Sequence, residues 1–219
     1  MRYKAAIFDF DGTLLDTLED LADSMNEVLT DFGMPTHPSE PYRYFVGDGM
    51  INLARRAAPE GTPDDVVRNM ARLMDDKYAV NWHRKTKPYP GVMDMLAAFR
   101  KRGVAMAVLS NKPDSFTRLM VRHFFPEGTF SAAFGARDTV PRKPDPAGAA
   151  EIASLFGFEP ASFLYFGDTN TDMLTGRNAG MRTIGVSWGF RPVTELLEAG
   201  AQAIIDSPGQ AVELLDNQS

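Results

Sequence analysis

Two aspartates, one residue apart, close an apolar run near the N-terminus in the stretch KAAIFDFDGTLLDT, residues 4–17. The run at 5–8 is continuously apolar, which is typical of a strand buried on both faces of a parallel sheet. Asp9 and Asp11 then lie at its carboxyl end, the edge where open α/β sheets bind ligands. Because neighbouring carboxylates repel each other unless a cation or a proton intervenes, the pair predicts one of these at this edge.

Further polar residues follow two later apolar runs and a proline-rich segment. VAMAVLS leads into Ser110 and Asn111, FLYFG leads into Asp168 and Asp172, and RKPDP places Lys143 just ahead of a helix. All strands of a parallel sheet end at one edge, so we expect these side chains to converge with the first aspartate pair.

The charges of the predicted cluster indicate what it binds. Asp9, Asp11, Asp168 and Asp172 carry −4 and Lys143 returns +1, so −3 remains, and one divalent cation lowers this to −1. Ligands that are all oxygen, with no histidine or cysteine, suit Mg²⁺. The hydroxyls of Ser110 and Thr13, with the backbone amides of the loop at Gly12, are good phosphate donors. Together these residues predict phosphoryl transfer with Mg²⁺.

The elements that position these residues alternate between strand and helix from about residue 87 to the C-terminus. This alternation predicts an α/β core with a parallel, Rossmann-like sheet flanked by helices. Between 17 and 85 the pattern is helical only, with breaks at Gly47 and Gly49, and Thr17 and Asp20 form a possible capping box. We therefore expect a catalytic core of 1–15 and 87–219, and an inserted all-helical cap domain of 16–86.

Four segments resemble the four motifs of the haloacid dehalogenase superfamily, in the order that this family uses: FDFDGTLLDT, VLSNK, RKPDP and FGDTNTD. The helical insert is similar to the family's C1 cap. VGDG in the insert and KPYPG at its exit resemble the phosphoglycolate-phosphatase branch.

The resemblance implies a role for each motif residue. Asp9 is the nucleophile that forms an aspartyl-phosphate, and Asp11 first protonates the leaving oxygen and then deprotonates the attacking water. Asp9, Asp168 and the backbone carbonyl of Asp11 ligate Mg²⁺, and Asp172 ligates the ion or orients it through water. The residues expected to bind phosphate are Gly12, Thr13, Ser110, Asn111 and Lys143.

The expected substrate is a small phosphorylated metabolite, with 2-phosphoglycolate the leading candidate. A helical lid leaves room for a compact leaving group, Gly47 lets the cap loop bend, and Arg43 offers a fork for a substrate carboxylate. A phosphosugar mutase or a pyrophosphatase of the same superfamily stays open, as does a phosphoreceiver signalling domain. A receiver needs neither a cap nor a second aspartate beside its nucleophile.

The composition and charge of the chain limit its possible partners, its location and the chemistry of its site. The 219 residues include 29 acidic and 23 basic side chains, a net charge of −6 that argues against a nucleic-acid partner. No apolar stretch is long enough to span a bilayer and no leader-like segment precedes the first strand, so we expect a cytoplasmic monomer or homodimer with no membrane partner. Thiol catalysis, disulfides and cysteine-ligated metals are excluded, because the chain has no cysteine.

Overall fold

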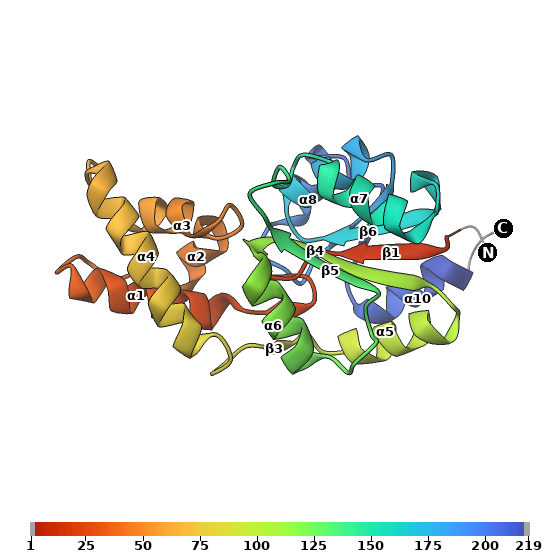
Figure 1. The fold of residues 1–219 in the computed structure, drawn as a ribbon, viewed down its shortest axis with the longest axis horizontal. Coiled ribbons are helices and arrows are strands. Elements are labelled where there is room, and N and C mark those ends of the chain that lie inside the picture. Colours follow the sequence, from red (N-terminus) through yellow and green to blue (C-terminus); the bar gives the residue numbers. More distant parts are fainter. Residues whose placement is uncertain (1–2, 217–219) are drawn as a thin grey trace. The chain divides into compact units, whose positions relative to one another are not determined.

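The computed structural model describes residues 3–216, and the chain divides into two compact units. One unit comprises Met1–Leu15 and Pro88–Ser219, and the other comprises Asp16–Lys87. In Figure 1 the first unit holds the sheet and the second holds the helices α1 to α4. None of the helices within residues 3–216 is both long enough and apolar enough to cross a membrane.

The first unit is built on a six-stranded sheet in the order β5-β4-β1-β6-β7-β8, and every pair of neighbours is parallel. The strands are β1 (Ala5–Phe8), β4 (Ala105–Pro113), β5 (Ala132–Ala136), β6 (Phe163–Gly167), β7 (Arg182–Val186) and β8 (Ala203–Ile205). Ile7 pairs with Ala107 on one side and with Tyr165 on the other, so β1 is central and buried on both faces. This confirms the predicted parallel sheet.

Helices cover both faces of this sheet, as the strand–helix alternation predicts. They are α5 (Val92–Lys101), α6 (Asp114–Phe124), α7 (Ala147–Phe156), α8 (Asn170–Asn178), α9 (Val193–Glu198) and α10 (Pro208–Asp216). Figure 1 shows α7 and α8 on one face and α5 and α10 on the other. Between the layers, the ring of Phe8 stacks on that of Phe166 with centroids 4.9 Å apart, which joins the two central strands.

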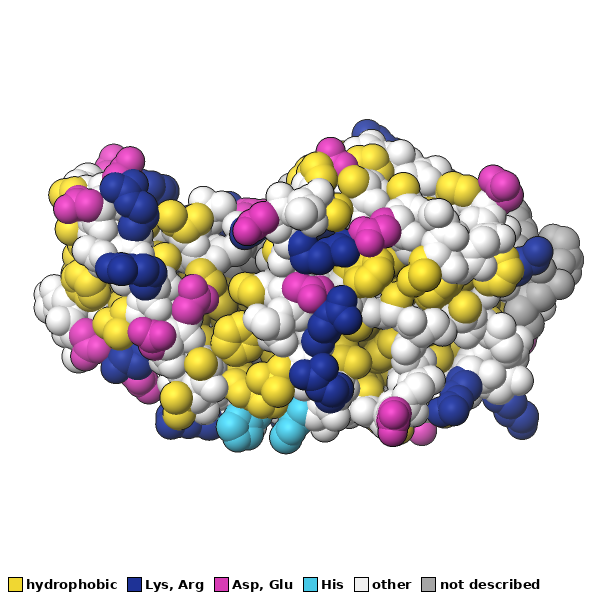
Figure 2. All heavy atoms as spheres, viewed as in Figure 1, with side chains coloured by type: hydrophobic (Ala, Val, Ile, Leu, Met, Phe, Trp, Pro, Cys, Tyr) yellow, Lys and Arg dark blue, Asp and Glu magenta, His cyan; other side chains and the backbone are white. Residues whose placement is uncertain are grey.

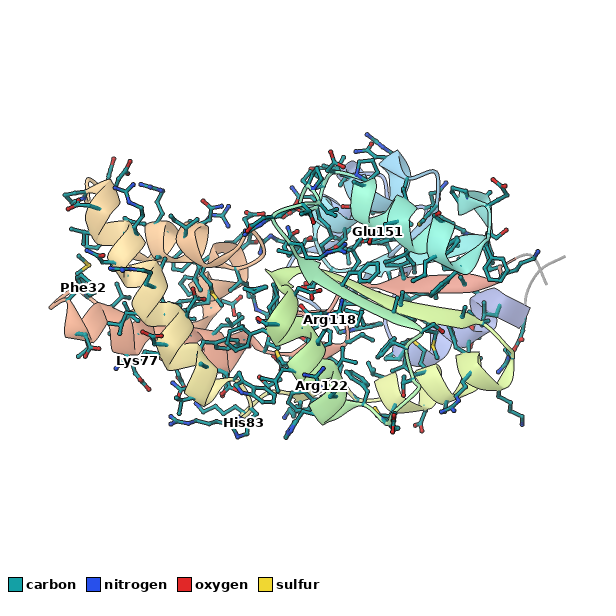
Figure 3. The ribbon with its side chains drawn as sticks, viewed as in Figure 1. Phe32, Lys77, His83, Arg118, Arg122 and Glu151 are labelled. Carbon is teal, nitrogen blue, oxygen red and sulfur yellow. The ribbon has the colours of Figure 1, made fainter. Side chains whose placement is uncertain are left out.

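The second unit is helical. It comprises α1 (Leu18–Asp31), α2 (Ser39–Phe45), α3 (Met50–Ala57) and α4 (Asp64–Asn81). Its core holds Met25, Met70, Met74, Tyr42 and Tyr78, all fully buried. Lys77 of α4 points toward α1 in Figure 3 and forms an ion pair with Asp31 at 3.0 Å. Between α2 and α3 the chain turns at Gly47 and Gly49, whose φ angles of 118° and 87° favour glycine.

Two features of this unit differ from the sequence expectation. Two-residue strands, β2 (Leu15–Asp16) and β3 (Lys87–Pro88), pair where the chain passes from one unit to the other. Thr17 precedes α1 without a side-chain capping bond, and the buried Asp20 carboxylate instead accepts bonds from the backbone N–H of Lys85 and Thr86 and from the Thr86 hydroxyl. The predicted capping box is therefore wrong: Asp20 ties α1 to the segment after α4.

Candidate active site

Three buried carboxylates meet at the carboxyl edge of the sheet. Asp9 follows β1, Asp168 follows β6, and Asp172 lies in the first turn of α8. One oxygen from each of the three lies within 4.8 Å of the others. The structure therefore brings together three of the four predicted carboxylates, although Asp9 lies more than 150 residues from the other two in the chain.

Lys143 is the cation at the centre of this group. Its buried ammonium donates to Asp9 and to Asp172, each at 2.7 Å. Asn111 positions it, because the Asn111 amide donates to the Lys143 carbonyl at 3.1 Å and accepts from the Lys143 N–H at 3.0 Å. The structure thus gives Asn111 a positioning contact, and its contact with phosphate stays a prediction.

The electrostatics of the cluster fit a bound cation. Burial, with the charges of Asp172 and Asp168, raises the pKa of Asp9 well above its usual range, although Lys143 opposes this shift. Burial and the charge of Asp172 raise the pKa of Asp168 to about 7. Burial opposes the charge of Lys143, but Asp172 and Asp9 raise its pKa nonetheless. Three carboxylates around one ammonium hold excess negative charge, and their oxygens are the ligands that Mg²⁺ prefers.

The loop after β1 holds Asp168 in place. The Thr13 hydroxyl donates to one Asp168 oxygen at 2.9 Å. Gly12 has φ 87°, and a Cβ at this position would lie 2.2 Å from the other Asp168 oxygen, so the loop passes closely only because the residue is glycine. Thr13, predicted as a phosphate donor, has this carboxylate as its hydroxyl partner in the structure.

A second loop that sequence reasoning missed completes the enclosure of Asp168. The Phe190 N–H donates to Asp168 at 2.8 Å, and the Trp188 indole N–H donates to the Thr13 carbonyl at 3.1 Å. A Cβ at Gly189 would lie 2.1 Å from the Asp168 Cβ. The only signal available in the sequence was the position of this loop directly after a predicted strand.

Asp172 has a structural role as well as a place in the carboxylate group. It forms a capping box with Thr169, whose N–H and hydroxyl donate to one Asp172 oxygen at 3.1 and 2.6 Å. Its other oxygen accepts from Lys143. The contact of Asp172 with a metal, direct or through water, stays a prediction.

A second buried lysine accompanies the second aspartate of the first motif. The Lys112 ammonium lies 3.2 Å from an Asp11 oxygen, and the Lys112 side chain is 3% exposed, against 17% for Asp11. The Ser110 hydroxyl accepts from the Lys112 N–H at 3.1 Å, where the pairing of β4 with β5 becomes irregular. Lys112 directly follows Ser110 and Asn111 in the sequence, but no role was predicted for it.

The two predicted cap residues lie in the helical unit. Arg43 on α2 pairs with Glu40 at 3.2 Å and its side chain is 34% exposed. Gly47 forms part of the turn between α2 and α3. Their contact with substrate stays a prediction. Figure 2 shows basic and acidic side chains interspersed over the face in view.

Known proteins match nearly the whole chain. Residues 6–186 match the family of haloacid dehalogenase-like hydrolases. A phosphoglycolate phosphatase from Psychrobacter arcticus is 31% identical over 216 residues, which cover 95% of this chain and 94% of that protein. One from Pseudomonas putida is 35% identical over 199 residues, covering 87% of this chain and 72% of that protein.

The fold is equally close to solved structures. A crystal structure of a Lactobacillus delbrueckii subsp. bulgaricus protein, provisionally described as a phosphoglycolate phosphatase, superposes with a TM-score of 0.92 at 33% identity, covering 98% of this chain and 99% of that one. The motifs, the sheet and these relatives agree. The chain belongs to the haloacid dehalogenase-like hydrolases, in the branch that includes the phosphoglycolate phosphatases.

Proposed function

We propose that this phosphoric monoester hydrolase depends on Mg²⁺ and works through an aspartyl-phosphate on Asp9, with 2-phosphoglycolate as its preferred substrate. The observation that carries the proposal is the grouping of Asp9, Asp168 and Asp172 within 4.8 Å around the ammonium of Lys143. This grouping offers a nucleophile, a cation site and a phosphate-binding cation in one place.

The grouping of carboxylates supports a proposed set of metal ligands. Asp9, Asp168 and the backbone carbonyl of Asp11 would hold Mg²⁺, with Asp172 as a direct or water-mediated ligand. When bound, the ion neutralises the repulsion between the Asp9 carboxylate and the phosphate that it must attack.

The reaction then proceeds in two displacements at phosphorus. A carboxylate oxygen of Asp9 forms a bond to phosphorus while the bond to the leaving oxygen breaks, and Asp11 gives that oxygen its proton. In the second step Asp11 takes a proton from water, whose oxygen bonds to phosphorus as the bond to Asp9 breaks. Inorganic phosphate leaves, and both aspartates return to their starting state.

The remaining polar groups hold the transferred phosphoryl group. The Lys143 ammonium and the Ser110 hydroxyl balance the charge on its oxygens. Gly12 carries no side chain that would keep the phosphoryl group from the backbone, although its own N–H donates to the Leu15 carbonyl at 2.9 Å.

The substrate proposal rests on the relatives. Two proteins that match most of this chain at 31% and 35% identity are phosphoglycolate phosphatases. The test compares kcat/KM for 2-phosphoglycolate, glycerol phosphate, pyrophosphate and hexose phosphates with MgCl₂ present. We expect 2-phosphoglycolate to be preferred by at least about tenfold, or roughly 1.4 kcal/mol in transition-state binding. A smaller preference contradicts the assignment of 2-phosphoglycolate as the substrate and leaves only the assignment as a phosphatase.

Substitution of Asp9 tests the chemistry separately from the substrate. Asp9→Asn should abolish turnover of every ester, because an amide is both a poor nucleophile and a poor ligand. Near-normal Mg²⁺-dependent hydrolysis by this variant would exclude the proposed nucleophile.

A further inference from the structure

The two buried lysines of the site form ion pairs with different aspartates. Lys143 pairs with Asp9 and Asp172, on the side where the proposed reaction handles the phosphoryl group. Lys112 pairs with Asp11, the residue proposed to protonate the leaving oxygen. The two cations therefore divide the site into a phosphoryl side and a leaving-group side.

The backbone around Lys112 fixes its position in the catalytic unit. Its N–H donates to the Ser110 hydroxyl at 3.1 Å, and its carbonyl accepts from the Thr117 hydroxyl at 3.4 Å. A lysine side chain held at 3% exposure is costly to charge unless acidic groups surround it, and the Asp11 carboxyl is one such group.

Lys112 also changes the charge balance of the site. The sequence count of −3 included Lys143 alone; with every carboxyl ionised, the four aspartates and two lysines total −2, which one divalent cation brings to zero. The proton that Asp11 carries in the first step brings the total to +1. The loaded site then carries no excess negative charge to repel an anionic leaving group.

The chemistry of the leaving group connects it to Lys112. In 2-phosphoglycolate the carboxylate carbon is two bonds from the oxygen that Asp11 protonates. An ammonium in contact with Asp11 is therefore within reach of that carboxylate, and its three donors allow it to contact both carboxyl groups. We infer that Lys112 is a specificity-determining residue that binds a carboxylate of the leaving group. This inference rests on the proposed function and deepens it.

The test uses pairs of esters that differ by one carboxylate. The first pair is 2-phosphoglycolate with 2-hydroxyethyl phosphate, and the second is phosphoserine with phosphoethanolamine. For each pair we define the carboxylate preference as the ratio of the two kcat/KM values. Both values come from one preparation, so the ratio does not depend on the folded fraction or on any general loss of activity.

We expect Lys112→Met to lower the carboxylate preference at least about tenfold, as expected for a lost charge-assisted hydrogen bond, chiefly through KM of the carboxylate ester. Lys112→Arg should keep a large part of the preference, because it keeps the charge. The matched control is Lys101→Met, an exposed lysine that ends α5 before β4 begins, at the opposite edge of the sheet; its preference should equal that of the wild type.

The outcomes separate this inference from the substrate proposal. If Lys112→Met leaves both ratios at the wild-type values, the inference is wrong even where 2-phosphoglycolate is the best substrate. If 2-phosphoglycolate is a poor substrate but the variant lowers the phosphoserine ratio, the inference holds and only the substrate proposal fails. If the wild type shows no carboxylate preference in either pair, Lys112 confers none and the inference is overturned.

Discussion

Asp168 has both of its oxygens bonded to protein donors, yet burial and the charge of Asp172 hold its pKa at about 7. Such a carboxyl binds its proton more tightly in the folded protein than in the unfolded chain, where its pKa is 3.8. The protonated carboxyl therefore contributes to the free energy of unfolding below pH 3.8, and this contribution is lost as pH rises through about 7. The raised pKa of Asp9 acts in the same direction. A bound cation removes this penalty.

Added Mg²⁺ should therefore stabilise the protein more at neutral pH than at acid pH, because the cation competes with protons for these carboxylates. We expect MgCl₂ to raise Tm measurably at pH 7.5 and less at pH 5.5. Asp168→Ala should abolish the increase at both. Differential scanning fluorimetry measures this without any turnover, and an equal increase in the variant would place the metal elsewhere.

Gly189 tests how closely the second loop encloses Asp168. A Cβ there would lie 2.1 Å from the Asp168 Cβ, so Gly189→Ala must displace the carboxylate or the loop. Overpacking of this kind costs roughly 1–3 kcal/mol, and we expect a lower Tm and a lower kcat/KM. Gly209→Ala is the matched control, since the nearest heavy atom, in Ser207, is 4.0 Å away and α10 favours alanine. A Tm as high for Gly189→Ala as for this control would contradict the described packing.

Position at a strand end decided which site residues could be predicted. Asp9 and Asp168 directly follow apolar runs, so their convergence follows from the topology of a parallel sheet. Lys112 also comes after an apolar run, but the sequence does not distinguish it from an ordinary solvated lysine, because a sequence does not show where a strand becomes irregular. Trp188 and Gly189 act through Thr13 and Asp168, and such long-range contacts leave no local pattern.

At the scale of elements, periodicity identified the long helices and the buried strands, while short-range signals misled. Thr17 and Asp20 have the spacing of a capping box, but the Asp20 carboxylate accepts hydrogen bonds from two backbone N–H groups 65 and 66 residues away. The strands β2 and β3 have two residues each, too few for any period to register.

Asp20→Ala should destabilise the helical unit, because it leaves two backbone N–H groups and a buried hydroxyl without their acceptor. Unsatisfied buried groups cost about 1–3 kcal/mol each, so we expect a loss of at least about 2 kcal/mol. Asp23→Ala on the same helix removes an exposed pair with Lys85, so we expect a much smaller loss of stability than for Asp20→Ala.

Urea unfolding followed by tryptophan fluorescence measures the unfolding midpoint of both variants. Trp82 lies in the helical unit and Trp188 in the other, so a Trp188→Phe background reports on the helical unit alone. Equal midpoints for the two Asp variants would mean that Asp20 does not tie α1 to the segment after α4.

For the whole molecule, the division into two units predicts an uneven response to metal. All four proposed ligands belong to the unit of Met1–Leu15 and Pro88–Ser219. Because a ligand slows only those openings that release it, MgCl₂ should slow amide exchange in β1, β6 and the loops after them, and leave Asp16–Lys87 unchanged. Hydrogen exchange with mass spectrometry resolves the two, and slowing confined to the helical unit would contradict the assignment of the metal site.

The proposed mechanism requires Asp9 to carry the phosphoryl group during turnover, and this can be measured. Asp11→Asn should lower turnover by about 10²–10⁴-fold and let the intermediate accumulate when the ester has a good leaving group, such as p-nitrophenyl phosphate. After mixing this variant with that ester and MgCl₂ and quenching in acid, we expect peptide mass spectrometry to find one added phosphoryl group, on Asp9. It should be absent without MgCl₂ and in the Asp9→Asn, Asp11→Asn double variant. Turnover that continues while the phosphoryl group is found on another residue would contradict the proposed mechanism.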